Sequence, residues 1–314
     1  MSSQLQQLLE AGHFVVTSEI GPPKGADPDA VRAAARAMRG AVDAVNITDN
    51  QTAVVRISSV ASAVLVQQEG VEAVVQMTVR DRNRIGLQSD LLGLAALGVP
   101  NAVCMSGDHP CNGNHPMAKP VYDLDSITWL QTASNMVHKG IFQCGEAIKK
   151  PPQVFLGAVE NPFAPPYDYR VIRLAKKVDA GARFIQTQCV FDLSFLRRFM
   201  ADVVNMGMHE KVKILVGITP LKSPKMARHM QGNVPGLQVP EELCRRMESA
   251  ADPKEEGIAI AVETIQAIRE IKGIAGIHLM PVLWEDVVPI VADRAGLLPR
   301  PVLVLPHPQP LSQG

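Results

Sequence analysis

Short apolar runs alternate with longer amphipathic stretches along most of the chain. The apolar runs are bounded by polar or turn-forming residues, which is typical of buried strands. They predict strands at 14–19, 44–48, 73–78, 102–106, 153–159, 183–188, 213–218 and 276–280. The stretches between them carry apolar residues at helical spacing and predict helices near 28–39, 53–69, 87–97, 124–138, 168–179, 193–207, 240–271 and 284–296.

This strict alternation of strand and helix predicts a closed parallel (β/α)8 barrel, the TIM-barrel fold, as a single domain. An open doubly wound sheet is the alternative, and it usually carries a glycine-rich phosphate-binding turn after its first strand. Gly21-Pro22-Pro23 stands there instead, and proline has no N–H to offer a phosphate. We expect the barrel to occupy residues 1–305 and the proline-containing segment 306–314 to be a flexible tail.

Composition narrows the possible partners. Lysine plus arginine and aspartate plus glutamate both total 31, so no net charge favours nucleic acid or an anionic membrane. The five cysteines are dispersed, with no metal-binding spacing, which predicts free thiols in a reducing cytoplasm and no metal site. The first residues do not resemble a signal peptide, and no apolar run approaches the roughly 20 residues that span a bilayer. We therefore expect a cytoplasmic protein that binds a small molecule or another protein.

Polar residues cluster at the predicted carboxyl ends of the strands, where barrel active sites are built. Hydrated strand ends are one explanation for any single position, but the whole set predicts a ligand with several hydrogen-bonding edges. The proline- and glycine-rich segments 108–123 and 219–240 are predicted to be loops on the same face. The polar candidates are Glu19, Thr48, Asp49, Gln76, Thr78, Ser106, Asp108, Glu160, Asn161, Gln186 and Gln188.

Glu19 is the most informative of these residues. It closes an apolar strand and is followed, after Ile20, by Gly-Pro-Pro. A carboxyl group in this position is expected to be partly desolvated, which favours its neutral form, and a general acid near neutral pH needs that form. The alternative is an ion pair with a neighbouring lysine or arginine.

Three further residues have two interpretations each. Asp108 follows Gly107 in a turn where the backbone can approach a planar ligand, or it forms a local turn with its own backbone. Gln188 has amide donors and an acceptor suited to a heterocycle, or it caps the next helix. Lys177 lies near a helix end, where a lysine is usually a solvated partner of the helix dipole.

Several segments in this order resemble the methylenetetrahydrofolate reductase family. The resemblance extends from about residue 10 to 297, and its most specific block is Lys-Val-Asp-Ala-Gly-Ala followed by Thr-Gln. The segments are TSEIGPPKG (17–25), AVCMSGDHP (102–110), LAKKVDAGARFIQTQCVFD (174–192) and VGITPLKSPKMARHM (216–230).

The resemblance implies a flavin-dependent reduction of 5,10-methylenetetrahydrofolate to 5-methyltetrahydrofolate. The flavin would be non-covalent FAD, or alternatively FMN, and its electrons would come from NAD(P)H or from a partner electron-donating subunit. Glu19 would be the general acid and would contact the folate, which Gln188 would also hold. Asp108 would lie beside flavin and pterin as a second catalytic residue, and the other flavin contacts would be Thr48, Gln76 and Lys177. A homo-oligomer or a hetero-complex is also implied.

Some positions depart from the family pattern. Gln76 stands where a histidine is common, and Arg170 stands where an acidic flavin contact is common. Val159 replaces a tyrosine, and Cys189-Val190 replaces two aromatic residues. The chain therefore resembles a divergent bacterial branch, with FAD or FMN and the electron donor left open. The alternative functions are a non-catalytic barrel subunit that binds folate or flavin, and a barrel aldolase or methyl-transfer enzyme without flavin.

Overall fold

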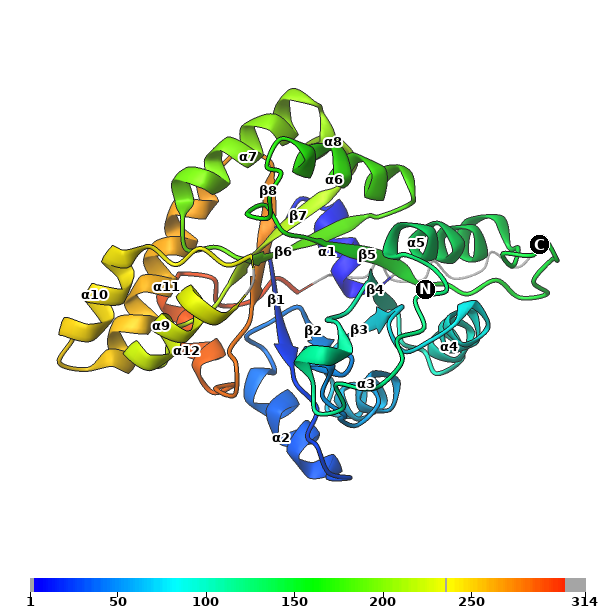
Figure 1. Ribbon diagram of the computed structural model, residues 1–314, viewed down its shortest axis with the longest axis horizontal. Helices are drawn as coiled ribbons and strands as arrows, with labels where there is room; N and C mark the ends of the chain where they lie inside the picture. The colour runs from blue at the N-terminus through cyan, green and yellow to red at the C-terminus, as the bar shows by residue number, and fades with distance from the viewer. Residues whose placement is uncertain (1–2, 235, 303–314) are drawn as a thin grey trace, which may run out of the picture.

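The strands of the computed structural model, which describes residues 3–234 and 236–302, form a closed parallel barrel. Each strand pairs with the next in chain order, and the last pairs with the first through Thr17 and His278. This confirms the predicted (β/α)8 fold (Figure 1). The strands are β1 (Val15–Ile20), β2 (Ala44–Ile47), β3 (Ala73–Thr78), β4 (Asn101–Met105), β5 (Phe155–Glu160), β6 (Phe184–Cys189), β7 (Lys213–Ile218) and β8 (Ile274–Leu279).

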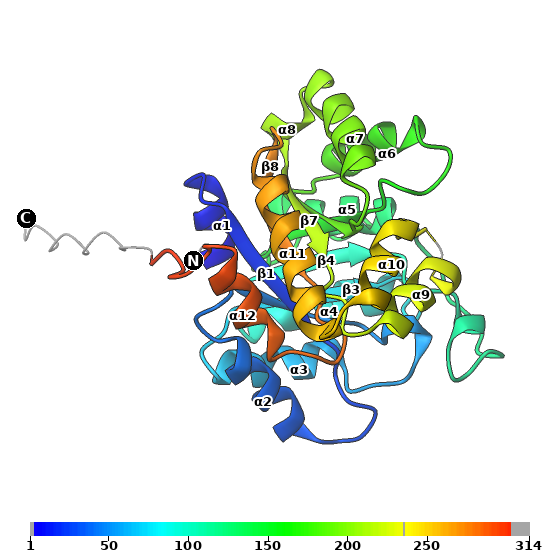
Figure 2. The same ribbon diagram turned by 90° about the vertical axis from the view of Figure 1, so that its left-hand side faces the viewer.

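Helices surround the barrel and cover the outer faces of its strands (Figures 1 and 2). The α-helices are α1 (Gln4–Glu10), α2 (Pro28–Met38), α3 (Ser59–Gln68), α4 (Arg84–Ala96), α5 (Ser126–Ser134), α6 (Tyr169–Asp179), α7 (Leu193–Asn205), α8 (Met208–Lys211), α9 (Pro224–Asn233), α10 (Glu241–Ser249), α11 (Pro253–Arg269) and α12 (Val287–Arg294). Shorter helical turns are η1 (Gln51–Ala53), η2 (Pro110–Asn112) and η3 (Asn135–Lys139).

Every predicted strand is present, with both ends within two residues of the expected positions. The helix predictions need three corrections. The single helix expected at 240–271 is two helices, α10 and α11, because Asp252 caps the second one and Pro253 occupies its first position. The helix expected at 53–69 begins only at Ser59. The loop expected at 219–240 contains α9, which Ser223 caps and Pro224 begins.

Helix α1 was not predicted, and it closes the amino-terminal end of the barrel. Its leucines Leu5, Leu8 and Leu9 are fully buried against the lowest layer of barrel side chains, which includes Val15 and Phe184. α1 thus lies at the end of the barrel opposite α9 and α10 (Figure 2). One end of the barrel is therefore apolar and closed, which leaves the carboxyl end for ligands.

Phe184 fills this lowest layer from β6. Its ring stacks on Phe155 with centroids 5.2 Å apart. Gly157 on β5 makes room for it, because a Cβ there would lie 2.4 Å from the ring Cζ. The barrel interior is thus packed at this end by a large side chain that only a glycine neighbour permits.

In the described part of the chain, no helix combines the length and the apolar character that a bilayer crossing requires. The expected boundary at residue 305 and the tail at 306–314 lie outside the described residues.

Candidate functional site

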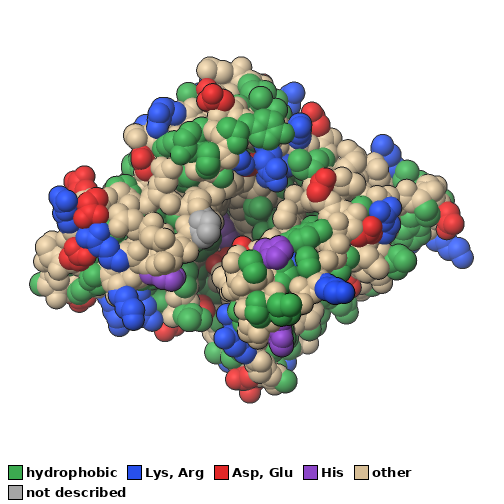
Figure 3. Space-filling model, in the orientation of Figure 1, with side chains coloured by type: hydrophobic (Ala, Val, Ile, Leu, Met, Phe, Trp, Pro, Cys, Tyr) green, Lys and Arg blue, Asp and Glu red, His purple; other side chains and the backbone are tan. Residues whose placement is uncertain are grey.

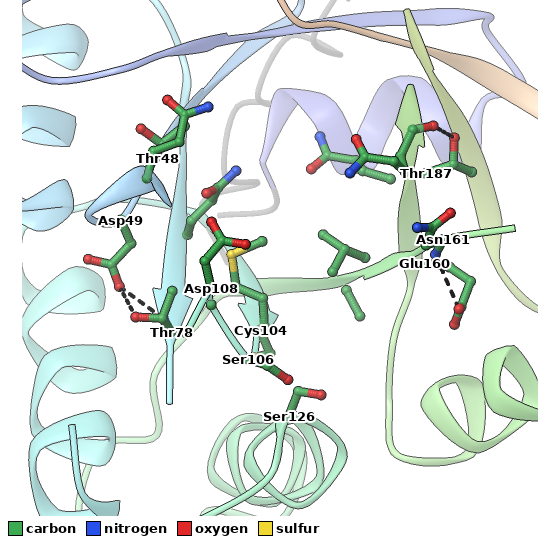
Figure 4. A pocket seen from close by; sticks show the side chains of 18 of the residues that line it. Thr48, Asp49, Thr78, Cys104, Ser106, Asp108, Ser126, Glu160, Asn161 and Thr187 are labelled. Carbon is green, nitrogen blue, oxygen red and sulfur yellow. Dashed lines mark hydrogen bonds between the residues drawn. The ribbon is translucent and has the colours of Figure 1, made fainter. Parts of the chain in front are cut away.

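A cavity of about 430 Å³ lies at the carboxyl end of the barrel. Figure 3 shows a hollow near the centre of this face, and Figure 4 shows it from close by, with Thr48 and Asp49 on one side and Glu160, Asn161 and Thr187 on the other. All of the predicted site residues line it, although they come from different strands and helices. These residues are Glu19, Thr48, Gln76, Asp108, Lys177 and Gln188.

Glu19 lies at the floor of the cavity, with 11% of its side chain exposed. Its Oε2 atom is 3.7 Å from Nε2 of His278, which belongs to the neighbouring strand β8. Among the described residues, no lysine or arginine forms an ion pair with Glu19. The alternative of an ion pair with a lysine or arginine is therefore wrong for the described chain.

Beneath Glu19 is a layer of four buried polar side chains, contributed by β1, β2, β6 and β8. Nδ1 of His278 lies 3.0 Å from the Thr17 hydroxyl and 3.3 Å from the Gln186 amide nitrogen. Gln186 also exchanges two hydrogen bonds with the Asn46 amide, at 2.6 and 3.0 Å. Nδ1 can accept a hydrogen bond from either partner or donate one to the hydroxyl, so the network fits either tautomer of the ring.

His278 was not among the residues predicted from the sequence. Its signal was present, because a histidine stands in the middle of an apolar strand segment, two residues before Met280. Thr17 could also have been found, because side chains two apart on a strand point to the same face and Glu19 was already a candidate.

Asp49 and Thr78 are hydrogen-bonded to each other. The Asp49 carboxylate accepts hydrogen bonds from the backbone N–H and the hydroxyl of Thr78, both at 2.9 Å, and from Arg82 at 2.6 Å. Figure 4 shows the Asp49–Thr78 pair at the edge of the cavity. These two polar candidates therefore join the ends of β2 and β3.

Asp108 is exposed at the rim, after a turn that requires glycine. Gly107 has φ of +80°, and a Cβ there would lie 2.9 Å from Cγ2 of Thr78. The Asp108 carboxylate accepts a hydrogen bond from the backbone N–H of Thr52 at 3.1 Å, so it ties the loop after β4 to the loop after β2. This contact differs from the local turn with its own backbone that was the alternative for Asp108.

The loop that Asp108 holds is strained. Asn50, Thr52 and Ala53 all have positive φ, at 46°, 56° and 57°. Such angles are rare for residues other than glycine and persist only where the surroundings enforce them. A Cβ at Gly113 would meet the carbonyl oxygen of Ala53, so the two loops touch through their backbones and form one rim of the cavity.

Lys177 lines the cavity wall, but it is buried and already paired. Its ammonium donates a hydrogen bond to Oε2 of Glu160 at 2.7 Å and another to the backbone carbonyl of Val159. Desolvation by burial lowers the pKa of Lys177, and the neighbouring Glu160 carboxylate opposes that shift. The alternative of a solvated dipole partner is therefore wrong.

Gln76, Thr48 and Gln188 supply hydrogen-bonding groups from three strands. In the described structure the backbone carbonyl of Gln76 accepts a hydrogen bond from the Ser59 hydroxyl at 3.2 Å, whereas its side-chain amide faces the cavity without a hydrogen bond to the protein. Thr48 donates a weak hydrogen bond to the Ile20 carbonyl at 3.4 Å. Gln188 accepts one from the Cys189 N–H at 3.0 Å, which leaves its amide N–H groups for a ligand. Gln188 does not cap the next helix, because Asp192 does.

Cys189 and Val190, two of the departures from the family pattern, are buried beside the cavity. Burial raises the pKa of the Cys189 thiol to about 12, so the thiol is protonated at neutral pH and is not a nucleophile. Its Sγ lies 2.8 Å from the hydroxyl of Thr219, so the side chain packs against the residue that follows β7.

The family model for methylenetetrahydrofolate reductase matches residues 4–296. The chain belongs to this family. A relative from Caenorhabditis elegans described as a probable methylenetetrahydrofolate reductase (NADPH) is 23% identical over 257 residues, which cover 79% of this chain and 36% of the relative. Methylenetetrahydrofolate reductase 2 of Schizosaccharomyces pombe is 24% identical over 253 residues, with 78% and 39% coverage. The match therefore spans well under half of these two members of the family.

Two solved structures show the same fold at low identity. A protein from Clostridium thermocellum that binds two copies of 5-methyl-5,6,7,8-tetrahydrofolic acid has a TM-score of 0.64 and 15% identity, covering 94% of this chain and all of that one. A 2,3-dimethylmalate lyase has a TM-score of 0.50 and 13% identity, with 93% and 84% coverage. The barrel of this chain is thus similar to that of a lyase, so the fold alone does not decide the function.

Proposed function

We propose that this chain reduces 5,10-methylenetetrahydrofolate to 5-methyltetrahydrofolate with a bound flavin. The single observation that carries the proposal is Glu19, a carboxyl group at the floor of the mouth cavity that no lysine or arginine pairs with in the described structure. Family membership and a methyltetrahydrofolate-binding structural neighbour support a folate substrate.

The residues of the cavity fit a flavin. Gln76 presents its side-chain amide and Gln188 the N–H groups of its amide to a heterocycle edge, and Gly107 lets the backbone of the β4 loop approach a planar ring. We propose Thr48, Gln76 and Asp108 as contacts of the isoalloxazine, and Gln188 as a contact of the folate. When bound, the flavin supplies the hydride that reduces the folate carbon.

Glu19 would act on the folate itself. The methylene group of the folate bridges two nitrogens within a five-membered ring. Protonation of one of these nitrogens lets its bond to the methylene carbon break, and the other nitrogen then forms an iminium with that carbon. The hydride reduces this iminium carbon to the methyl group. Glu19 leaves the step as a carboxylate, and Nε2 of His278, 3.7 Å away, is the group that can stabilise the charge or return a proton.

We propose two alternative electron donors for the flavin, NAD(P)H and a partner subunit. The absence of aromatic side chains at Cys189 and Val190 favours the partner subunit, because stacking of a nicotinamide ring on an aromatic face would be missing there. A cytoplasmic location and assembly as a homo-oligomer or hetero-complex remain predictions from the sequence.

The deciding experiment uses the purified protein reconstituted with FMN or with FAD. The bound flavin is reduced photochemically without oxygen and mixed with 5,10-methylenetetrahydrofolate, while flavin absorbance and 5-methyltetrahydrofolate are followed. Flavin reoxidation with equal formation of product is the expected result. A protein that binds flavin and folate but transfers nothing would be the non-catalytic subunit, and one that binds no flavin would overturn the proposal.

A further inference from the structure

Helix α6 presents three cationic side chains to one wall of the cavity. Arg170, Arg173 and Lys177 all line it, and their spacing along the helix places them on the same face. The chain as a whole has equal numbers of acidic and basic residues, so this concentration of positive charge is local.

One carboxylate faces these three cations. Glu160 is bound to the Lys177 ammonium at 2.7 Å and lies 3.8 Å from a terminal nitrogen of Arg170. Among the described residues, Arg173 forms no ion pair. Two positive charges therefore remain unbalanced on this wall, and their mutual repulsion disfavours the arrangement unless an anion joins it.

The guanidinium of Arg170 also has a buried donor without a hydrogen-bond acceptor. Only 13% of its side chain is exposed, and one terminal nitrogen donates to the Pro165 carbonyl at 2.9 Å. Its Nε is fully buried and has no hydrogen-bond partner. A buried unsatisfied donor on a charged group is costly, and a bound ligand is one of the few explanations for it.

We propose that Arg170 and Arg173 bind the phosphate group of the flavin. The inference rests on the proposed flavin site and deepens it, because it assigns the phosphate to two arginines and not to Lys177, whose ammonium Glu160 already holds. A guanidinium matches phosphate oxygens with paired N–H donors, and a phosphate monoester carries about −1.5 to −2 charges at neutral pH. FMN and FAD both offer phosphate, so both are candidate ligands of this wall.

The test measures binding, not turnover. Dissociation constants of riboflavin, FMN and FAD for the flavin-free protein are obtained from quenching of flavin fluorescence. In the unaltered protein FMN or FAD should bind more tightly than riboflavin, and the order of FMN and FAD identifies the natural ligand. Arg173→Leu should raise the dissociation constant of the phosphorylated flavin by roughly 10- to 100-fold, as expected for the loss of charge-assisted hydrogen bonds. The affinity for riboflavin should stay nearly unchanged.

Lys176→Leu is the matched control, because Lys176 is an exposed cation on the same helix that does not line the cavity and bonds to the Tyr169 hydroxyl. It should leave all three affinities unchanged. Arg173→Lys keeps the charge without the paired donors and should fall between the unaltered protein and Arg173→Leu. Equal affinity of the unaltered protein for riboflavin, FMN and FAD would contradict phosphate binding by Arg170 and Arg173, but not the flavin site. Failure to bind any of them would overturn the proposed function itself.

Discussion

Nε2 of His278 lies 3.7 Å from Oε2 of Glu19 where β8 closes against β1. The two residues come from opposite ends of the chain, and the closure of the barrel brings them together. His278 is in turn bound through Nδ1 to Thr17, which stands two residues before Glu19 on the same strand. The carboxyl group is therefore positioned by a network of buried polar groups that exists only in the closed barrel.

Replacement of Glu19 by glutamine should remove the proposed general acid and keep the shape of the side chain. The rate of flavin reoxidation by 5,10-methylenetetrahydrofolate should fall by roughly 10²- to 10⁴-fold, because one proton donor contributes about that much. Rapid-mixing absorbance of the reduced protein measures it. Reduction of the flavin by its electron donor serves as the internal control and should stay within a factor of about two, since that half-reaction needs no proton for the folate. A variant that reduces folate as fast as the original protein contradicts the role of Glu19.

His278 should act on the reaction through Glu19. Changing His278 to leucine removes the polar group that faces the carboxyl, and we expect a loss of about 10-fold in folate reduction together with an altered pH profile. Glutamine at the same position can still place an amide near Glu19 and should recover part of the rate. If both variants lost the same activity with an unchanged pH profile, a purely structural role for His278 would be the better explanation.

The strands could be predicted because parallel barrel strands are buried on both faces and therefore appear as continuous apolar runs. Helix boundaries were harder. Pro224 and Pro253 each suggest a loop or a break, yet both occupy the first turn of a helix, where proline is favoured. Helix α1 is only seven residues long, and although Ser3 caps it, its stability depends on burial of its leucines against the barrel.

The site could be predicted in outline, because polar residues at the carboxyl ends of barrel strands converge whatever their order in the sequence. Asp49 illustrates the limit. It follows Thr48 directly, but its side chain turns to Thr78 and Arg82, and the pattern of polar residues contains no information about that direction. The pairing of Lys177 with Glu160 joins a helix to a different strand end, so it too depends on the closed fold.

The Lys177–Glu160 pair should be important for stability. Lys177→Met leaves a buried carboxylate without its cation, and the loss of one partner of a buried pair costs about 3–5 kcal/mol of unfolding free energy. Urea denaturation followed by circular dichroism measures this cost. The double variant Lys177→Met with Glu160→Gln removes both charges and should be more stable than the single variant. A single variant as stable as the original protein would show that Glu160 finds another partner, and Arg170 is the nearest candidate.

Asp108 should tune the flavin if the two are neighbours. Asp108→Asn removes a negative charge but retains an oxygen that can accept the hydrogen bond from the Thr52 N–H, so the rim should keep its structure. Reduced flavin carries more negative charge than oxidised flavin, and loss of the neighbouring carboxylate should therefore raise the reduction potential. A coupling of about 1–2 kcal/mol corresponds to roughly 20–40 mV for a two-electron couple, which equilibration with a reference dye can measure. An unchanged potential would place the flavin away from Asp108.

Gly157→Ala should destabilise the barrel at its closed end. The added Cβ would lie 2.4 Å from the Phe184 ring, and the ring is held by its stacking on Phe155 and by the leucines of α1. Overpacking of this kind costs about 1–3 kcal/mol, which a lower urea midpoint would reveal. Gly93→Ala is the matched control, because Gly93 lies inside α4 with no atom within 4 Å of an added Cβ. That change should stabilise the helix by roughly 0.5–1 kcal/mol. The two substitutions should therefore change the free energy of unfolding in opposite directions. If Gly157→Ala were neutral, the Phe184 ring would have to move, and the apolar layer beneath the active-site floor would be more adaptable than its packing indicates.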